Sequence, residues 1–191
     1  RAIKKTTKNQ QIKEESENHQ EIKSFFGLLT GTLHLENRIS RLFQGCFLHS
    51  SSFRNAFLSL LLEKNIVKNN MLHQYNWDCF FQPQTPNSAQ LKPDLLLSTV
   101  TTKGNKIDFY IESKIHATLT DKQLRNYRQN GVQHLIALTK FIPDIPLSKL
   151  GKLDVNALRW QDIHATLVVQ KHKSQHDRFI CNHFVKFLEE A

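Results

Sequence analysis

Cysteine is scarce in this chain, which has only Cys46, Cys79 and Cys181 among its 191 residues. The three are far apart in the sequence, and no Cys-x-x-Cys pair occurs. An odd, sparse set of cysteines argues against a disulfide framework, and an iron–sulfur cluster needs about four thiolates. We therefore expect reduced, mostly buried thiols, as is typical of a cytoplasmic protein.

Long hydrophobic runs are missing as well. No apolar stretch approaches the roughly 20 residues of a membrane-spanning helix, and no signal-peptide pattern is visible. The sequence therefore predicts no membrane partner. The chain begins at Arg1 rather than at Met, so we expect a fragment, a processed chain or a trimmed piece of a longer protein.

Acidic residues are outnumbered by basic ones. Asp and Glu total 17 against 26 Lys and Arg, which gives a formal net charge of +9. Such an excess favours a polyanionic partner. Nucleic acid, and DNA above all, is the first candidate. An anionic membrane is the weaker one, because no basic amphipathic helix stands apart from the core pattern.

The composition divides the chain into a polar tail and one domain. Residues 1–24 are polar and mixed in charge, with few large apolar side chains, so we expect a tail or linker there. Residues 25–191 contain no internal repeat and are long enough for one domain with a sizeable core.

The first half of that domain shows two helical patterns and then strand signals. From Leu35 to Phe47, apolar residues recur at the helical period of about 3.6, and Glu36 lies on the flank of this stripe. Serines at 50–52 supply an N-cap for a second helix that ends near Glu63. Strands are expected over 75–82, 95–100 and 107–113, the last two joined by a hairpin turn at Gly104-Asn105.

The second half alternates helix and strand. A helix over 122–130, capped by Thr120 and Gly131, precedes an apolar strand over 132–138, and this order predicts a parallel crossover. A loop over 141–151, a short strand over 155–160 and helices over 161–170 and 178–190 are expected to follow. The order predicts an α/β fold in which helices flank a mixed sheet.

The strongest functional signal lies in the two hairpin strands. Lys92-Pro93-Asp94 opens the first, and Glu112-Ser113-Lys114 ends the second. Residues two apart on a strand point to the same face, so Glu112 and Lys114 project together. In a hairpin, Asp94 can lie across from Glu112. Two carboxylates and an ammonium at one place suit a hard divalent cation and phosphodiester hydrolysis.

Each half of this pattern also has an ordinary explanation. An Asp after Pro is usually a turn residue, and Glu-x-Lys at a strand end is usually a solvated ion pair. The order, the spacing, the hairpin and the helix that follows favour the catalytic interpretation.

The Pro-Asp and Glu-x-Lys elements resemble the signature of the PD-(D/E)XK nuclease superfamily. The resemblance covers roughly residues 30–190, including Arg-Trp-Gln-Asp-Ile at 159–163, and implies a three-layer α/β/α restriction-endonuclease-like fold. It implies that Asp94 and Glu112 bind Mg²⁺, with Mn²⁺ as a substitute, and that the backbone carbonyl of Ser113 is a third ligand. Lys114 would orient the attacking water or stabilise the transition state.

Many members of the superfamily also carry an acid on a helix before the hairpin. The resemblance therefore implies that Glu36 binds a second metal or holds the first through water. We expect its carboxylate roughly 4–7 Å from those of Asp94 and Glu112. The alternative is an early-turn acid that is favoured by the helix dipole.

The helix after the catalytic strand carries Gln123 and Tyr127, four residues apart on one face. Similar pairs occur in the RecB-like branch of the superfamily. The resemblance implies that Gln123 reaches the active site and that Tyr127 packs or touches the substrate backbone; a surface Gln and a packed Tyr are the alternative. Candidate phosphate contacts are Lys122, Arg125 and Arg128 on a separate face, which also suits plain solvation, and His116 at the site rim.

Three functions stay open at this level. The leading one is a Mg²⁺-dependent nuclease that hydrolyses DNA. A catalytically inactive nucleic-acid-binding domain of the same fold is the second. A nuclease toxin domain of a larger protein, with an immunity partner, is the third. The sequence leaves open RNA against DNA, strandedness, base specificity, and whether the chain forms a homodimer or joins further domains.

Overall fold

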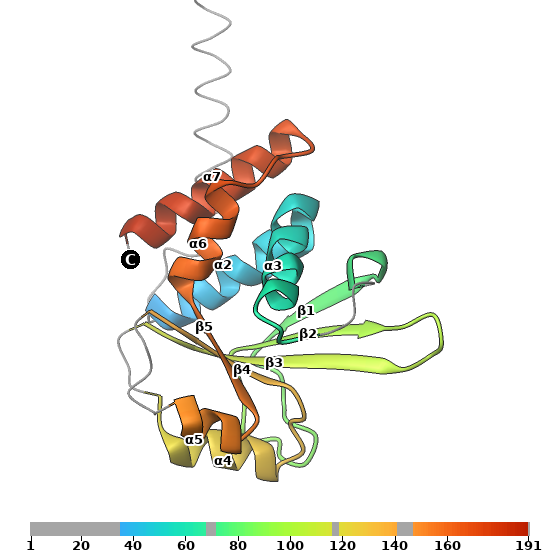
Figure 1. Ribbon diagram of the computed structural model, residues 1–191, viewed down its shortest axis with the longest axis vertical. Coiled ribbons are helices and arrows are strands. Elements are labelled where there is room, and N and C mark those ends of the chain that lie inside the picture. The colour runs from blue at the N-terminus through green and yellow to red at the C-terminus, as the bar shows by residue number, and fades with distance from the viewer. Residues whose placement is uncertain (1–34, 68–71, 116–118, 141–146, 191) are drawn as a thin grey trace, which may run out of the picture. The chain divides into compact units, whose positions relative to one another are not determined.

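A computed structural model describes residues 35–67, 72–115, 119–140 and 147–190 (Figure 1). The predicted tail over 1–24 lies outside the described residues, and so does His116. The fold and the site below concern the described residues alone.

Five strands form one mixed sheet in the order β1-β2-β3-β4-β5. They are β1 (Trp77–Phe81), β2 (Leu95–Val100), β3 (Lys106–Lys114), β4 (Leu135–Thr139) and β5 (Val155–Arg159). β2 is antiparallel to β1 and to β3, whereas β4 is parallel to both β3 and β5. The predicted hairpin and the predicted parallel crossover are therefore confirmed.

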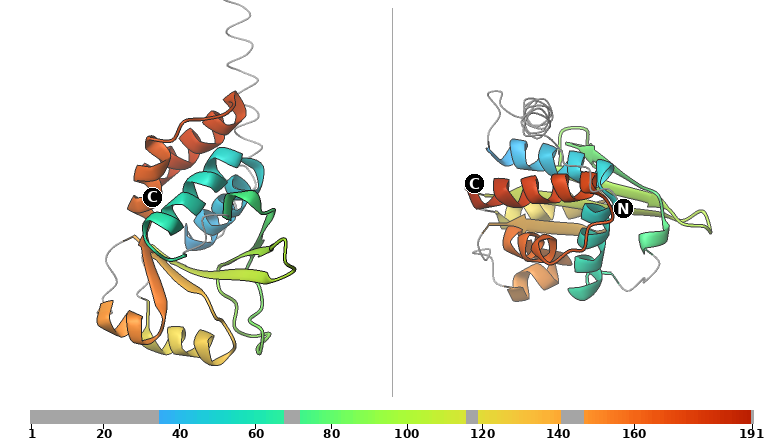
Figure 2. Two further views of the ribbon diagram at one scale, coloured as in Figure 1. Left: turned by 45° about the vertical axis from the view of Figure 1, so that its right-hand side comes forward. Right: turned by 90° about the horizontal axis from the view of Figure 1, so that it is seen from above.

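Helices cover both faces of this sheet. They are α2 (Leu35–His49), α3 (Ser51–Glu63), α4 (Asp121–Gln129), α5 (Leu147–Lys152), α6 (Trp160–Val168) and α7 (Gln175–Glu190), with a short 3₁₀ turn, η1 (Leu72–Gln74). Figures 1 and 2 show α4 and α5 on one face and α2, α3, α6 and α7 on the other. The predicted α/β fold, a mixed sheet flanked by helices, is confirmed.

Two apolar layers fix the helices to the sheet. On the α2 side the helices pack on one another through aromatic rings. The Phe43 ring of α2 lies 4.9 Å from the Phe57 ring of α3, and the Phe53 ring of α3 lies 4.9 Å from the Phe184 ring of α7. On the α4 side, Leu96 and Tyr110 of the hairpin pack with Leu124 and other buried residues. Because side chains alternate along β3, Tyr110, Glu112 and Lys114 face α4. The three cysteines are buried and free, as the sequence predicts.

Local signals set the ends of the helix that faces the site. The Thr120 hydroxyl accepts a hydrogen bond from the Gln123 N–H at 3.2 Å, which caps α4 as predicted. Gly131 has φ +86°, and a Cβ there would lie 3.1 Å from Pro86 and Asn87 of the β1–β2 loop. Both the left-handed turn and the close approach require glycine at the end of this helix.

Several boundaries differ from the sequence prediction; β4, for example, begins at Leu135 rather than at 132, and three further differences follow. Residues 147–151, predicted as loop, belong to α5. Trp160, predicted as strand, starts α6, because the Asp162 carboxylate accepts from the Arg159 N–H at 2.9 Å. The last helix begins at Gln175 rather than at 178, since the Ser174 hydroxyl accepts from the Asp177 N–H at 3.0 Å.

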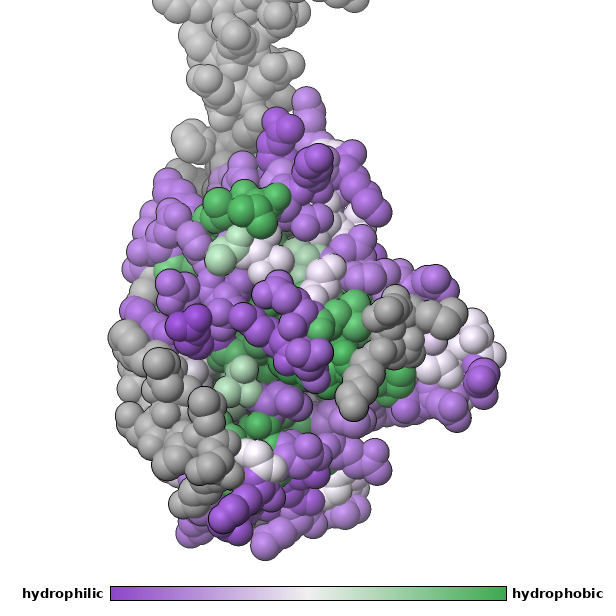
Figure 3. Space-filling model, in the orientation of Figure 1, coloured by the Kyte–Doolittle hydropathy of each residue, from purple (hydrophilic) through white to green (hydrophobic). Residues whose placement is uncertain are grey.

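The face seen in Figure 3 is mostly hydrophilic, with smaller apolar areas. Within the described ranges, no helix combines the length and the apolar character needed to cross a bilayer.

Candidate active site

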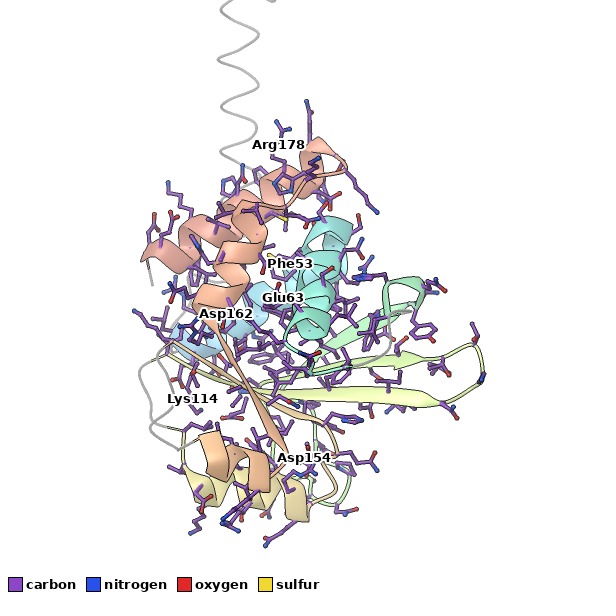
Figure 4. All side chains as sticks on the ribbon, in the orientation of Figure 1. Phe53, Glu63, Lys114, Asp154, Asp162 and Arg178 are labelled. Carbon is purple, nitrogen blue, oxygen red and sulfur yellow. The ribbon has the colours of Figure 1, made fainter. Side chains whose placement is uncertain are left out.

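The hairpin brings the predicted acids and lysine together at one end of the sheet. The Asp94 carboxylate accepts a hydrogen bond from the Ser113 N–H at 2.7 Å, and Lys114 Nζ lies 2.7 Å from Glu112 Oε1. Both carboxylates are buried, with Asp94 9% and Glu112 3% exposed. Figure 4 shows Lys114 at the end of the sheet opposite the β2–β3 turn. A solvated ion pair at a strand end, which is the ordinary explanation of Glu-x-Lys, would not be buried to this extent.

α4 holds the Glu112 carboxylate from the other side. Gln123 Nε2 donates to Glu112 Oε1 at 2.6 Å, and the Tyr127 hydroxyl donates to Glu112 Oε2 at 2.7 Å. Both carboxylate oxygens are thus fixed by donors from one helix face. Tyr127 is only 4% exposed, so its ring packs in the core and its hydroxyl orients Glu112. Burial, and next the charge of Glu112, raises the pKa of this hydroxyl, which keeps it a donor.

Glu36 reaches the same end of β3 from the first turn of α2. Its carboxylate accepts from the Ile115 N–H at 3.1 Å and lies 3.8 Å from Lys114 Nζ. Glu36 therefore reaches the end of β3 at Lys114, while the expected separation of roughly 4–7 Å from the Asp94 and Glu112 carboxylates stays a prediction. These contacts hold the carboxylate beside Lys114, and its role as a metal ligand stays a prediction.

The electrostatics of the cluster are dominated by burial and by like charges. Burial, followed by the neighbouring Glu112, raises the pKa of Asp94 to about 7, against the opposing effects of the Ser113 N–H and Lys114. Burial by itself lowers the pKa of Lys114, but Glu112, Asp94 and Glu36 together raise it above its usual value. Lys114 is thus a stable ammonium among three acids, and the cluster has an excess of negative charge when all of them are ionised.

The donor set fits a magnesium ion held by two acids. The described part of the chain contains no group of three or more His, Cys, Asp or Glu side chains that could hold a metal ion. Mg²⁺ does not require such a group, because it usually takes one or two carboxylates and keeps several waters. Asp94 and Glu112 could supply those carboxylates, and a cation beside them would offset the burial and the repulsion by Glu112 that raise the pKa of Asp94.

The backbone of Ser113 also suits a ligand role. Even-numbered residues of β3 bond to the β4 side, as in the 2.9 Å bond from the Tyr110 N–H to the His134 carbonyl. Odd-numbered residues therefore turn their backbone groups toward β2. Leu95 pairs with Ile111, so continuing the register by two residues puts Pro93 opposite Ser113. Proline has no N–H to donate, which leaves the Ser113 carbonyl without a strand partner at that position.

The basic residues of α4 have mixed surroundings. Lys122 is exposed, whereas Arg125 pairs with Asp121 at 2.9 Å. Arg128 pairs with Asp154 at 2.9 Å and donates to the Val132 and Gln133 carbonyls, which braces the end of α4 against the start of β5. Phosphate contacts by these three residues, as by His116, stay predictions.

Comparisons with protein-family models, curated proteins and solved structures found no match to this chain. The functional assignment therefore depends on the geometry described above.

We expect Tyr127→Phe to weaken both the fold and the site, because it removes the donor to Glu112 Oε2 and leaves a buried acceptor unpaired. The expected cost is about 1–3 kcal/mol in the free energy of unfolding, measured by urea denaturation. Tyr75→Phe, which removes a hydroxyl outside this cluster, is the control. An unchanged unfolding free energy for Tyr127→Phe would show that its bond to Glu112 does not contribute.

Proposed function

We propose that this chain is a metal-dependent nuclease that hydrolyses DNA phosphodiester bonds, in the manner of the PD-(D/E)XK superfamily. One observation carries the proposal: the buried carboxylates of Asp94 and Glu112 lie with the Lys114 ammonium at one end of the hairpin, with Lys114 Nζ 2.7 Å from Glu112 Oε1. Burying two acids is costly unless a cation or a set of donors compensates. Glu112 has such donors in Gln123, Tyr127 and Lys114, but the pKa of Asp94 is still raised to about 7, so part of the cost is uncompensated. A site with such a cost is a candidate for chemistry rather than for stability.

Asp94, Glu112 and the Ser113 carbonyl are the residues that would hold Mg²⁺, with Mn²⁺ as a substitute. When bound, such an ion would acidify a water molecule and polarise the scissile phosphate. Lys114 contributes a compact positive charge that can orient the attacking water or stabilise charge developing on the phosphate oxygens.

Three neighbours hold these groups in place. Gln123 and Tyr127 fix both oxygens of Glu112, so that its carboxylate cannot rotate away. Glu36 binds the Ile115 N–H at 3.1 Å just after the strand end and helps to keep Lys114 charged. These roles are positional, and for Glu36 we also propose a contact to the metal, directly or through water.

The charge of the chain supports a nucleic-acid partner. A net charge of +9 would attract a polyanion and would steer it toward the protein. DNA in a cytoplasmic setting is the substrate and location that we propose. The intact Asp, Glu and Lys in mutual reach favour an enzyme over an inactive binding domain.

The proposal predicts cleavage that depends on a divalent cation. Linear and circular DNA, single-stranded DNA and RNA would each be incubated with protein plus Mg²⁺, Mn²⁺ or EDTA and resolved on gels. We expect DNA products with Mg²⁺ or Mn²⁺ and none with EDTA. Binding should weaken as salt rises, by nearly one log unit per log unit of salt for each phosphate contact. Cleavage that persists in EDTA, or binding that is insensitive to salt, would contradict the proposal.

A further inference from the structure

α2 docks on the edge strand β1 through three successive side-chain contacts. Gln82 Nε2 donates to Asn37 Oδ1 at 3.3 Å, and the Arg41 guanidinium lies 4.2 Å from the centre of the Phe81 ring. The third contact is Gln44 Nε2, which donates to the Cys79 carbonyl at 2.8 Å. The helix residues are four and then three apart, which is one face of a helix. We call this contact the seam. It consists of residues 37, 41 and 44 of α2, residues 79 and 81 of β1, and residue 82 just after β1.

The seam changes character along its length. The Gln44 contact is partly buried and protects the outer edge of the sheet, as an edge strand requires. We call the side chains of Asn37 and Gln82 the amide pair. Arg41 and Gln82 are exposed, so the guanidinium and the amide pair are open to a ligand. The mutual hydrogen bond of the amide pair uses the nitrogen of Gln82 and the oxygen of Asn37. Among the described residues, this leaves Asn37 Nδ2 available as a donor and Gln82 Oε1 available as an acceptor.

The exposed end of the seam adjoins the candidate active site on two sides. The Gln82 N–H donates to the Asp94 carbonyl at 2.8 Å, so Gln82 lies beside the first acid on the neighbouring strand. Asn37 follows Glu36, whose carboxylate contacts Ile115 and Lys114. A polynucleotide with its scissile phosphate at Asp94 and Glu112 would therefore pass next to this end of the seam.

Gln82 is also held in an uncommon backbone conformation. Its φ is +46°, in the left-handed region that a residue with a Cβ rarely adopts. Glycine would be the unstrained choice there, yet glutamine occupies the position and turns its amide toward Asn37. Strain of this kind concentrates at ligand sites.

We propose that Asn37, Arg41 and Gln82 form the subsite for the nucleotide next to the scissile phosphate, with Arg41 on a backbone phosphate and the amide pair on the base edge. The inference rests on the proposed nuclease function and names the part of the substrate that this surface recognises. The Phe81 ring supports the guanidinium from beneath and lowers the entropy that Arg41 loses on binding a phosphate. One free donor beside one free acceptor matches adenine, which offers N7 as acceptor and N6 as donor.

The phosphate contact is tested by affinity and its salt dependence. Arg41→Ala would be made in the Glu112→Gln background, and binding of labelled single- and double-stranded oligonucleotides would be followed by fluorescence anisotropy in Mg²⁺. We expect about tenfold weaker binding and a log–log salt slope smaller by about 1. Arg178→Ala is the matched control, since it removes the same charge from an exposed arginine on α7 (Figure 4). Equal effects of the two substitutions would overturn the contact.

The amide pair is tested by base preference. Cleavage rates would be measured for oligonucleotides that carry each of the four bases on either side of the cut. The unmodified protein, Asn37→Ala and Gln82→Gly would be compared. We expect about tenfold faster cleavage with adenine at one flanking position, lost in both variants. Gln82→Gly also relieves the backbone strain, so its thermal stability should not fall, and lost preference cannot then be attributed to unfolding. Uniform cleavage of all four bases would overturn this assignment.

Failure of this inference is distinguishable from failure of the proposed function. Cleavage that requires Asp94 and Glu112 but is indifferent to Arg41, Asn37 and Gln82 would remove the subsite alone. A protein that neither binds nor cleaves any polynucleotide would remove both.

Discussion

Glu112→Gln is expected to lower DNA cleavage by at least about 100-fold and to leave the protein folded. The substitution keeps the size of the side chain. Its single oxygen can accept from Gln123 and its NH2 group can donate to the Tyr127 hydroxyl, so the packing is kept, but the charge that a cation needs is removed. Lys114→Ala should cause a loss of similar size, because it removes the ammonium 2.7 Å from Glu112 Oε1. Each variant would be compared in initial cleavage rate with Mg²⁺, and its fold checked by circular dichroism.

A matched control lies on the same strand. Asp108 faces the same side of β3, pairs with Lys106 at 2.8 Å and accepts from the Ser98 hydroxyl at 2.6 Å, but it lies toward the hairpin turn. Asp108→Asn therefore neutralises a lysine-paired acid of this strand away from the site and should leave the rate unchanged. A rate near normal in Glu112→Gln or Lys114→Ala would contradict the assignment, and so would an equal loss in Asp108→Asn.

The parts of the fold that sequence could predict are those set by local rules. The alternation of side chains along the strands and the turn residues Gly104-Asn105 predict the β2–β3 hairpin. The hairpin in turn brings Asp94 to the end of β3. The four-residue spacing of Gln123 and Tyr127 predicts a shared helix face, which the structure turns toward Glu112. The caps at Ser50 and Thr120 are likewise local, since each hydroxyl accepts from an N–H three residues later.

The remaining contacts of the site depend on how the helices and strands pack against one another, and the periodicity of the sequence does not predict this packing. The period of α2 places Glu36 beside the apolar stripe, but only the packing of α2 on the sheet shows that it meets Lys114 and the Ile115 N–H. The spacing of Lys122, Arg125 and Arg128 predicts one solvated basic face. Arg128 nevertheless pairs with Asp154, which lies in the turn before β5. The pairing of Asn37 with Gln82, which are 45 residues apart, has no local signal.

Asp94→Asn is expected to stabilise the protein above neutral pH in the absence of metal, although it should abolish cleavage. Burial and the neighbouring Glu112 raise the pKa of Asp94 from 3.8 to about 7. A raised pKa means that the folded state binds the proton more tightly than the unfolded chain does. Ionised Asp94 therefore destabilises the folded state, whereas asparagine still accepts from the Ser113 N–H and carries no charge.

The sign and the pH window follow from those two pKa values. Below about pH 4 the carboxyl is protonated in both states, so Asp94→Asn should have little effect on stability. Between about pH 4 and pH 7 only the unfolded chain has released the proton, and the unmodified protein loses about 1.4 kcal/mol of stability per pH unit from this group. Above about pH 7 both states are ionised, and the deficit is constant at a few kcal/mol.

The measurement is the difference in unfolding free energy between Asp94→Asn and the unmodified protein, taken by urea denaturation in EDTA at several pH values. Groups that titrate alike in both proteins cancel in this difference. We expect the difference to grow from near zero at pH 4 to a plateau near pH 8. Adding Mg²⁺ should stabilise only the protein that keeps Asp94, and so reduce the difference, because a ligand stabilises the state that binds it. A difference that is independent of pH, or a less stable Asp94→Asn at pH 8, would mean that the buried acids are already compensated and need no cation.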